Sequence, residues 1–211
     1  TAGLFTAIGI NAALYDRQKT GKGTFIDVSM LDCQIAILEN AIARYLSKNE
    51  IPEPMGSRHP SIAPFEAFKT KDNYIIIAAG NDKLFEKLCN VLNIAEIAND
   101  ERFNTNSLRC ENMNQLKKIF EKQLKSKTTD EWIKEMELLK IPCGPILNIK
   151  QAVENPQIKE RNMIVKSYHK IIGEFKSAGN PIKMSTYKDT DTRGDIPDLN
   201  EHREKIIKEF S

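Results

Sequence analysis

Prolines gather in one segment of this chain, and that segment constrains the fold more than any other feature of the sequence. Residues 48–64 contain four prolines and one glycine, namely Pro52, Pro54, Gly56, Pro60 and Pro64. Proline fixes φ and has no amide donor, so neither a helix nor a central strand continues through such a segment. We therefore predict a domain boundary here, with residues 49–62 forming a linker and a glycine-containing loop.

The residues before the prolines show two periodicities in turn. Apolar side chains recur at helical spacing from Leu4 to Arg17, and Thr20–Gly23 supplies a helix stop signal. Residues 24–30 alternate between two kinds of side chain, which predicts a strand. A second helix is predicted next, with one apolar face formed by Leu31, Ile35, Leu38, Ile42 and Tyr45. Helix, strand and helix in this order are typical of an α/β fold.

The residues after the prolines predict a hairpin followed mainly by helices. Residues 65–79 read as two strands joined by a turn at Lys71–Asn73. Two helices are predicted over residues 82–92, with Asp82 as the cap, and over residues 108–127. A third helix is predicted to begin at a Thr128–Glu131 capping box, and a fourth to run from Asn148 to Val153. Residues 141–145 read as a turn. Short strands with glycine turns are expected from residue 163, and a charged helix is expected over 200–210.

The composition excludes several classes of partner. Lys and Arg number 31 and Asp and Glu number 29, so the net charge of +2 is too even to attract nucleic acid or an anionic membrane surface. The longest apolar run has about six residues, whereas a membrane-spanning helix needs about 20. The four cysteines share no short ligand spacing with the three histidines. We therefore expect no metal site and no disulfide framework.

Two places in the sequence are candidate sites for chemistry. Cys143 with a histidine would make a nucleophile pair, but it lies between two prolines, and a structural turn is the better interpretation. The second candidate is the loop Gly56, Ser57, Arg58 and His59, which combines small residues with a cation and an imidazole. A linker with an incidental histidine explains this loop equally well, so the residues alone do not assign a function.

Several segments together resemble the class III CoA-transferases, the family of formyl-CoA transferase and carnitine CoA-transferase. The similar segments, in order along the chain, are residues 1–4, 12–17, 20–23, 25–30, 56–65, 68–72, 141–145 and 155–157. The segment from Gly56 to Phe68 is most similar to the succinate/glutarate-type dicarboxylate CoA-transferases. The resemblance runs through nearly the whole chain.

The resemblance implies a fold and a missing residue. In this family a Rossmann-like large domain and a small α+β domain form an interlocked ring dimer, so residues 1–48 and 151–211 would belong to the large CoA-binding domain and residues 63–150 to the small one. The family's aspartate nucleophile would lie about two residues before Thr1. We therefore expect a C-terminal fragment that has no catalytic residue of its own and is inactive.

The resemblance also implies an activity. The whole enzyme would move CoA from a succinyl-CoA-like donor to a small carboxylic or dicarboxylic acid through an aspartyl-CoA thioester, with the CoA thioester as substrate and no permanently bound cofactor. Gly56 and Ser57 would give the loop flexibility or N–H contacts, and Arg58 or His59 would meet a substrate carboxylate, Arg58 being the stronger bidentate partner. Arg58→Ala is then expected to raise the KM for the acceptor acid.

Alternatives from other functional classes stay open at this point. An acyl-CoA racemase of the same family would need acid and base groups for an α-proton. A non-catalytic remnant would act only as a binding module. The scattered cysteines favour a reducing compartment, so we expect a cytoplasmic location, with the mitochondrial matrix as the alternative.

Overall fold

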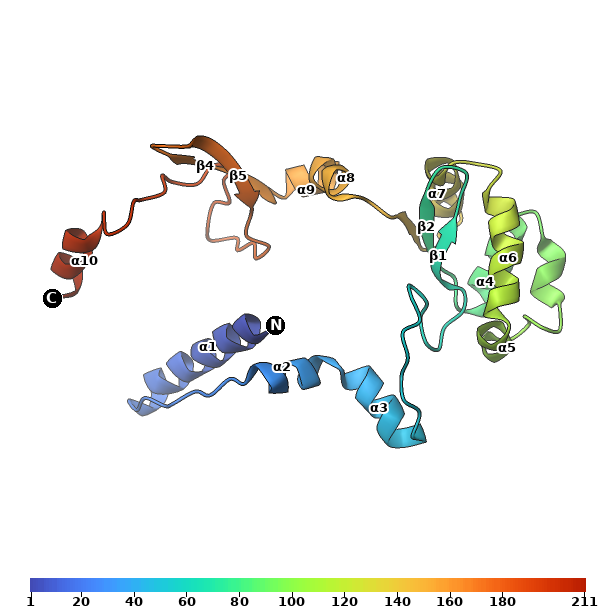
Figure 1. The fold of residues 1–211 in the computed structure, drawn as a ribbon, viewed down its shortest axis with the longest axis horizontal. Coiled ribbons are helices and arrows are strands. Elements are labelled where there is room, and N and C mark those ends of the chain that lie inside the picture. Colours follow the sequence, from blue (N-terminus) through green and yellow to red (C-terminus); the bar gives the residue numbers. More distant parts are fainter. The chain divides into compact units, whose positions relative to one another are not determined.

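The computed structural model describes residues 1–211 and combines helices with two antiparallel sheets (Figure 1). The chain divides into two compact units, residues 1–56 and residues 57–211. The first unit is helical, and both sheets lie in the second. The predicted mixture of helices and strands is therefore present.

The first unit contains the helices α1 (Ala2–Thr20), α2 (Met30–Ile37) and α3 (Glu39–Lys48). α1 ends as its sequence predicts, because Gly21 takes the left-handed φ of 71° that a helix stop requires. The predicted helix after residue 30 is divided at Leu38, whose ψ of 19° interrupts the helical backbone. One apolar stripe therefore spans two helices.

The strand predicted for residues 24–30 is wrong. Residues 22–29 belong to no helix or strand, and Met30 is already the first residue of α2. A strand forms only when a neighbour completes its ladder of hydrogen bonds, and no strand of this chain pairs with these residues. The alternating pattern is therefore present without the sheet that it would need.

The first unit has almost no core of its own. Cys33 is its single buried residue, and α1 buries none. The large apolar side chains that predicted the helices and the strand are exposed instead, among them Leu4, Ile8, Tyr15, Phe25 and Leu31. Much of the apolar surface of α1 and α2 is thus exposed within this unit.

The second unit begins with a three-stranded antiparallel sheet of β1 (Phe65–Lys69), β2 (Tyr74–Ala78) and β3 (Cys143–Pro145), in the order β1-β2-β3. The predicted hairpin is confirmed, with Phe68 opposite Ile75 in the register. The prediction that residues 141–145 form only a turn is wrong, because Cys143 pairs with Ile77 across the strands. Residues 143–145 become a strand only through β2.

Helices follow the hairpin along the chain. They are α4 (Asp82–Val91), the 3₁₀ helix η1 (Ala95–Asn99), α5 (Asn106–Glu111), α6 (Met113–Leu124) and α7 (Thr129–Leu138), with α6 contacting β1 and α7 contacting β2 and β3. The cap of α4 is Asn81 rather than Asp82, because the Asn81 side chain accepts the Leu84 amide. The single helix predicted for 108–127 is divided at Asn112. The Thr128–Glu131 capping box is confirmed.

One apolar core holds the sheet and these helices together. Its members lie between Ala63 and Ile141, and Phe68, Ile75, Leu116 and Phe120 are fully buried. Trp132 is also buried, and its indole nitrogen donates to the carbonyl of Leu124 at 2.8 Å. Burial of this apolar surface is the main stabilisation of the second unit.

The rest of the chain contains α8 (Ile149–Glu154), α9 (Pro156–Glu160), the antiparallel pair β4 (Ile164–His169) and β5 (Gly173–Ala178), and α10 (Arg203–Phe210). The Asn148 cap, the two short strands and the last helix agree with the prediction, whereas α9 has no counterpart in it. No helix has the length and apolar character needed to cross a membrane.

Candidate functional site

The candidate loop runs from Gly56 to Pro64 and leads directly into β1. Gly56 has a left-handed φ of 68°, a conformation that favours glycine. Ser57 is held against the first strand, because its hydroxyl accepts the amide of Ala67 at 3.1 Å. The start of the loop is therefore tied to the rigid sheet.

Arg58 lies over β1 and contacts two polar groups. Its Nε donates to Oε1 of Glu66 at 3.3 Å, and its Nη2 donates to Oδ1 of Asn114 on α6 at 2.7 Å. Glu66 is 3% exposed, and its other oxygen accepts from Lys117. Two cations thus neutralise one buried carboxylate, and Arg58 is drawn toward the sheet.

His59 is held at its ring and at its backbone. The imidazole stacks on the ring of Phe65 with centroids 5.3 Å apart and an interplanar angle of 7°. The His59 amide donates to the Phe65 carbonyl at 2.9 Å, and Nδ1 accepts the amide of Ser61 at 3.2 Å. These contacts give the imidazole one orientation.

Two residues that sequence reasoning missed hold the far end of the loop. Asn106 brackets it, accepting the Ala63 amide at 3.0 Å and donating to the Ser61 carbonyl at 2.9 Å. Arg109 is fully buried and donates Nε to the Ala63 carbonyl at 2.8 Å. The available signal was its spacing of four from Met113 in the single helix that the sequence predicts, although the two residues lie in α5 and α6.

Each of the three guanidinium nitrogens of Arg109 donates a hydrogen bond. The guanidinium also donates to the carbonyls of Phe103 and Gly80, both at 3.0 Å, and to the carboxylate of Asp82 at 2.8 Å. Its carbon lies 4.5 Å from the centroid of the Phe85 ring, where a cation is favoured. Arg109 therefore links the loop to α4 and to the core.

Of the four predicted loop residues, Ser57, Arg58 and His59 are thus held by contacts with β1 and α6 or within the loop, and the polar atoms they offer differ. Ser57 turns its hydroxyl to β1, and Arg58 directs Nε and Nη2 to neighbouring side chains. His59 uses Nδ1 within the loop itself. Nη1 of Arg58 and Nε2 of His59 make no hydrogen bond in the structure and are the atoms that can donate to an anionic ligand such as a carboxylate.

Cys143 is the other residue that the sequence singled out. It lies in β3 and packs against the core, and burial raises the pKa of its thiol. The pKa of Cys89, which is fully buried, is raised by burial to about 12. A thiol with a raised pKa is a poor nucleophile, so the structural interpretation of Cys143 is the better supported one.

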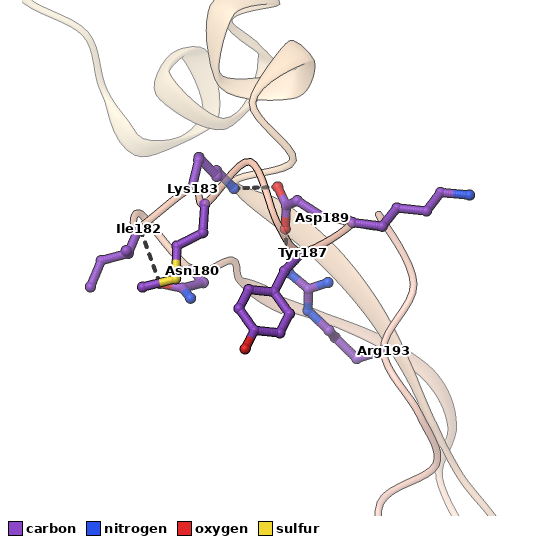
Figure 2. Close-up of a pocket in the computed structure, with 8 residues that line it drawn as sticks. Asn180, Ile182, Lys183, Tyr187, Asp189 and Arg193 are labelled. Carbon is purple, nitrogen blue, oxygen red and sulfur yellow. Dashed lines mark hydrogen bonds and ion pairs between the residues drawn. The ribbon is translucent and has the colours of Figure 1, made fainter.

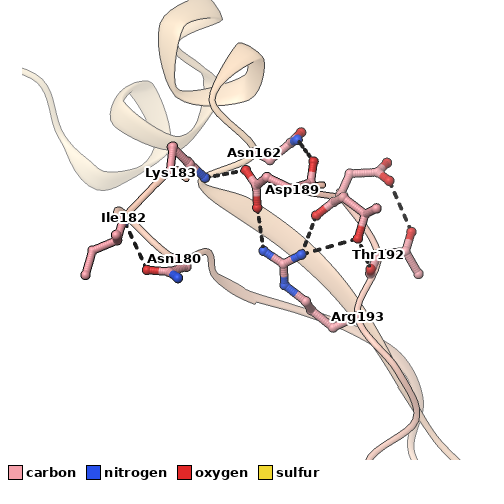
Figure 3. A network of polar contacts seen from close by, with 9 residues as sticks. Asn162, Asn180, Ile182, Lys183, Asp189, Thr192 and Arg193 are labelled. Carbon is pink, nitrogen blue, oxygen red and sulfur yellow. Dashed lines mark hydrogen bonds and ion pairs between the residues drawn. The ribbon is translucent and has the colours of Figure 1, made fainter. Parts of the chain in front are cut away.

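A cavity of about 360 Å³ lies in the segment after β5, far along the chain from the loop (Figure 2). Its lining residues carry three cations and one carboxylate, namely Lys183, Lys188, Arg193 and Asp189. Figure 3 shows that Asp189 accepts from both Lys183 and Arg193. The hydrogen bond from Lys183, and after it the hydrogen bond from Arg193, holds the pKa of the Asp189 carboxyl below its usual range.

This network is best explained as a structural tie. Arg193 also donates to the Thr190 carbonyl at 2.7 Å, and Asn162 donates to the Asp189 carbonyl at 2.9 Å (Figure 3). The Lys166 amide of β4 donates to the Asp191 carbonyl at 2.8 Å. Lys183 and Arg193 therefore share an internal carboxylate, and the segment is fastened to β4.

Comparison with known proteins places the chain in a family. It is 39% identical over 209 residues to an acetyl-CoA:oxalate CoA-transferase from Acetobacter aceti, covering 99% of this chain and 52% of that protein. It is 34% identical to the human succinyl-CoA:glutarate CoA-transferase, covering 98% of this chain and 47% of that protein. The chain thus spans about half the length of these curated relatives.

A solved structure agrees. The crystal structure of a CAIB/BAIF family protein from Brucella suis matches with a TM-score of 0.78 and 36% identity, covering 100% of this chain and 54% of that chain. The model of CoA-transferase family III matches residues 1–203, nearly the whole sequence. The resemblance drawn from the sequence motifs is confirmed, and this chain belongs to CoA-transferase family III.

Proposed function

We propose that this protein transfers CoA from an acyl-CoA, such as succinyl-CoA, to a small dicarboxylic acid. The observation that carries the proposal is the family III match over residues 1–203. The names of two relatives pair an acyl-CoA with oxalate and with glutarate, and both of these acids are dicarboxylates. Coenzyme A thioesters are then substrates, and no permanently bound cofactor is needed.

The proposed chemistry exchanges one thioester for another through covalent intermediates. An aspartate carboxylate attacks the donor thioester and releases CoA thiolate, which leaves a mixed anhydride. The thiolate then attacks the aspartyl carbonyl, releases the donor acid and forms an aspartyl-CoA thioester. The acceptor carboxylate repeats the two steps in reverse, which yields the new acyl-CoA and restores the aspartate.

We place that aspartate about two residues before Thr1, at the start of α1, where the N-terminal end of the helix dipole favours a carboxylate. Asp16, Asp27 and Asp32 do not occupy that position. Anhydrides hydrolyse easily, so water has to be kept away from the reacting atoms. We assign that role, and contact with the acid substrate, to the loop of Gly56, Ser57, Arg58 and His59.

The proposed assembly follows the family. Residues 1–48 and 151–211 would form part of a Rossmann-like large domain, and residues 63–150 would form the small domain of an interlocked homodimer. The exposed apolar side chains of α1 and α2 support this arrangement, since an exposed apolar surface of this kind favours burial in an interface. The proposed location is the cytoplasm, with the mitochondrial matrix as the alternative.

The test uses the complete protein encoded by the gene. It is incubated with succinyl-CoA or acetyl-CoA and a panel of dicarboxylic acids, and the new acyl-CoA is measured by mass spectrometry. We expect exchange that depends on an acceptor acid, a trapped aspartyl-CoA adduct, and loss of both when the aspartate before Thr1 is replaced by alanine. Absence of exchange with every acid contradicts the proposal.

A parallel incubation separates the alternatives. The protein is mixed with an acyl-CoA in deuterated solvent without any acceptor acid. Exchange of the α-proton under these conditions favours a racemase, because that chemistry moves a proton instead of CoA. Binding of acyl-CoA without exchange of proton or CoA favours a binding module.

A further inference from the structure

We propose that His59 supplies, through its Nε2–H, the hydrogen bond that holds a carboxylate of the acid substrate. This inference rests on the proposed function and deepens it, because it selects one donor atom of the loop. It depends on the tautomer of the ring, on the accessibility of Nε2 and on a second histidine of the same chain.

The tautomer follows from the hydrogen bonds of the loop. The Ser61 amide donates to Nδ1 of His59 at 3.2 Å, so Nδ1 acts as an acceptor and bears no proton. In the neutral imidazole the proton is then on Nε2, which becomes a donor. The stacking on Phe65 and the bond from the His59 amide to the Phe65 carbonyl fix the direction of that donor.

Nε2 is available to a ligand. None of the hydrogen bonds or ion pairs in the structure uses this atom, and every fully buried side-chain nitrogen or oxygen has a partner. His59 is half-buried. Its unpartnered nitrogen is therefore among the atoms that solvent reaches, and a ligand oxygen can replace water there.

A second histidine shows which group fits such a ring. Nδ1 of His169 accepts the amide of Ile171, two residues later, at 3.2 Å, which is the arrangement of His59 and Ser61. Nε2 of His169 lies 3.3 Å from a carboxylate oxygen of Asp198. The same local geometry thus occurs twice in the chain, and in one case a carboxylate stands at Nε2.

Arg58 is less available than its neighbour. Two of its three guanidinium nitrogens are directed to Glu66 and Asn114, and Arg58 shares the Glu66 carboxylate with Lys117. A ligand would have to share Arg58 with a buried carboxylate. We therefore assign Arg58 to positioning the loop on β1 and α6, and His59 to contacting the acid.

The test compares two variants in the complete protein. In His59→Asn the side-chain oxygen can still accept the Ser61 amide, but the distal donor is lost. In His59→Gln the amide nitrogen reaches the place of Nε2 and restores a donor. We expect His59→Asn to raise the acceptor KM about tenfold and His59→Gln to stay within about threefold of wild type, with the acyl-CoA KM changed less than about twofold in both.

The outcomes separate this inference from the proposed function. An active wild type whose acceptor KM is unchanged in His59→Asn overturns the role of His59 and leaves the transferase standing. For a wild type without transferase activity, ¹⁵N NMR of the histidines tests the role of His59 directly. An Nε2-protonated His59 whose signal moves when glutarate is added supports the inference, and an Nδ1-protonated ring or an unmoved signal overturns it.

Discussion

At the scale of single residues, Glu66 stands out as a buried carboxylate that is shared by two cations. Its side chain is 4% exposed, while those of Arg58 and Lys117 are 25% and 30% exposed. Glu66→Gln leaves both cations without a counter-charge. We expect the free energy of unfolding to fall by about 2 kcal/mol, measured by urea denaturation.

The matched control is Glu135→Gln. Glu135 pairs with Lys127 in an ion pair whose side chains are 41% and 36% exposed. Solvent screens such a pair, so we expect the free energy of unfolding to change by less than about 1 kcal/mol. Equal losses in the two variants would show that burial of Glu66 is unimportant.

The same residues show what sequence can and cannot predict of the site. Arg58 and His59 stand out within a few residues of one loop, because composition there is unusual. Their partners do not, since Asn114 is 56 residues from Arg58 and the Asn106–Ser61 pair is 45 residues apart. Such pairs depend on how the helices return to the sheet, which no local pattern contains.

At the scale of elements, one carboxylate joins the β1–β2 turn to α7. Oδ1 of Asp72 accepts the amide of Thr129 at 2.8 Å. This hydrogen bond is the main cause of the lowered pKa of the Asp72 carboxyl. A lowered pKa in the folded state stabilises it above the unfolded pKa of about 3.9, and this stabilisation is lost as the pH falls through the folded pKa.

The prediction concerns the pH dependence of Asp72→Asn. We expect the variant to unfold at a lower urea concentration than wild type at pH 6–7, with a difference that shrinks as the pH falls below about 4. Asp195 is exposed and makes no side-chain hydrogen bond, so Asp195→Asn serves as the control. A difference between wild type and Asp72→Asn that is constant with pH would contradict the assignment.

A second element-level prediction concerns the end of β5. A Cβ added at Gly179 would lie 2.2 Å from the backbone oxygen of Asn162, whereas one added at Gly194 would meet nothing within 4 Å. Backbone cannot give way cheaply, so Gly179→Ala should destabilise the β4–β5 pair by about 1–3 kcal/mol. Amide exchange in β4 is expected to accelerate about tenfold or more in Gly179→Ala and to stay unchanged in Gly194→Ala.

Elements with local causes were predictable, and those with distant causes were not. The Thr128–Glu131 and Asn148–Gln151 capping boxes each lie within four residues, and both helices start where the sequence indicates. β3 forms a strand only because β2 lies beside it. Residues 24–30 form no strand because no other strand pairs with them. In both segments the pairing with another strand determines whether a strand forms. The periodicity of one segment does not show whether such a partner is present.

At the scale of the whole molecule, the two units differ in how they are stabilised. Residues 1–56 bury only Cys33, whereas the second unit has an extended apolar core. In the 211-residue chain taken alone, we expect amides of α1 to exchange at least about a hundredfold faster than those of α6, because local opening of α1 exposes almost no new apolar surface. Equal protection of α1 and α6 in hydrogen exchange would contradict this expectation.

A further prediction concerns the activity of the 211-residue chain. Because the proposed nucleophile lies before Thr1, the 211-residue chain is expected to show no CoA transfer under conditions in which the complete protein is active. Acyl-CoA production by the 211-residue chain, assayed by mass spectrometry, would place the nucleophile within residues 1–211 and overturn its assignment upstream.

The order β1-β2-β3 has one more consequence. Phe65 lies opposite Ala78 and Cys143 lies opposite Ile77, so the first and the third strand flank the same stretch of β2. The polypeptide enters at Phe65 and leaves at Pro145, which lies opposite Ile75, so with strands about 4.8 Å apart and a rise of about 3.4 Å per residue these two points are about 14 Å apart. Lengthening or shortening the connections between the intervening helices leaves that spacing unchanged, so relatives can vary in size there without displacing the segments on either side.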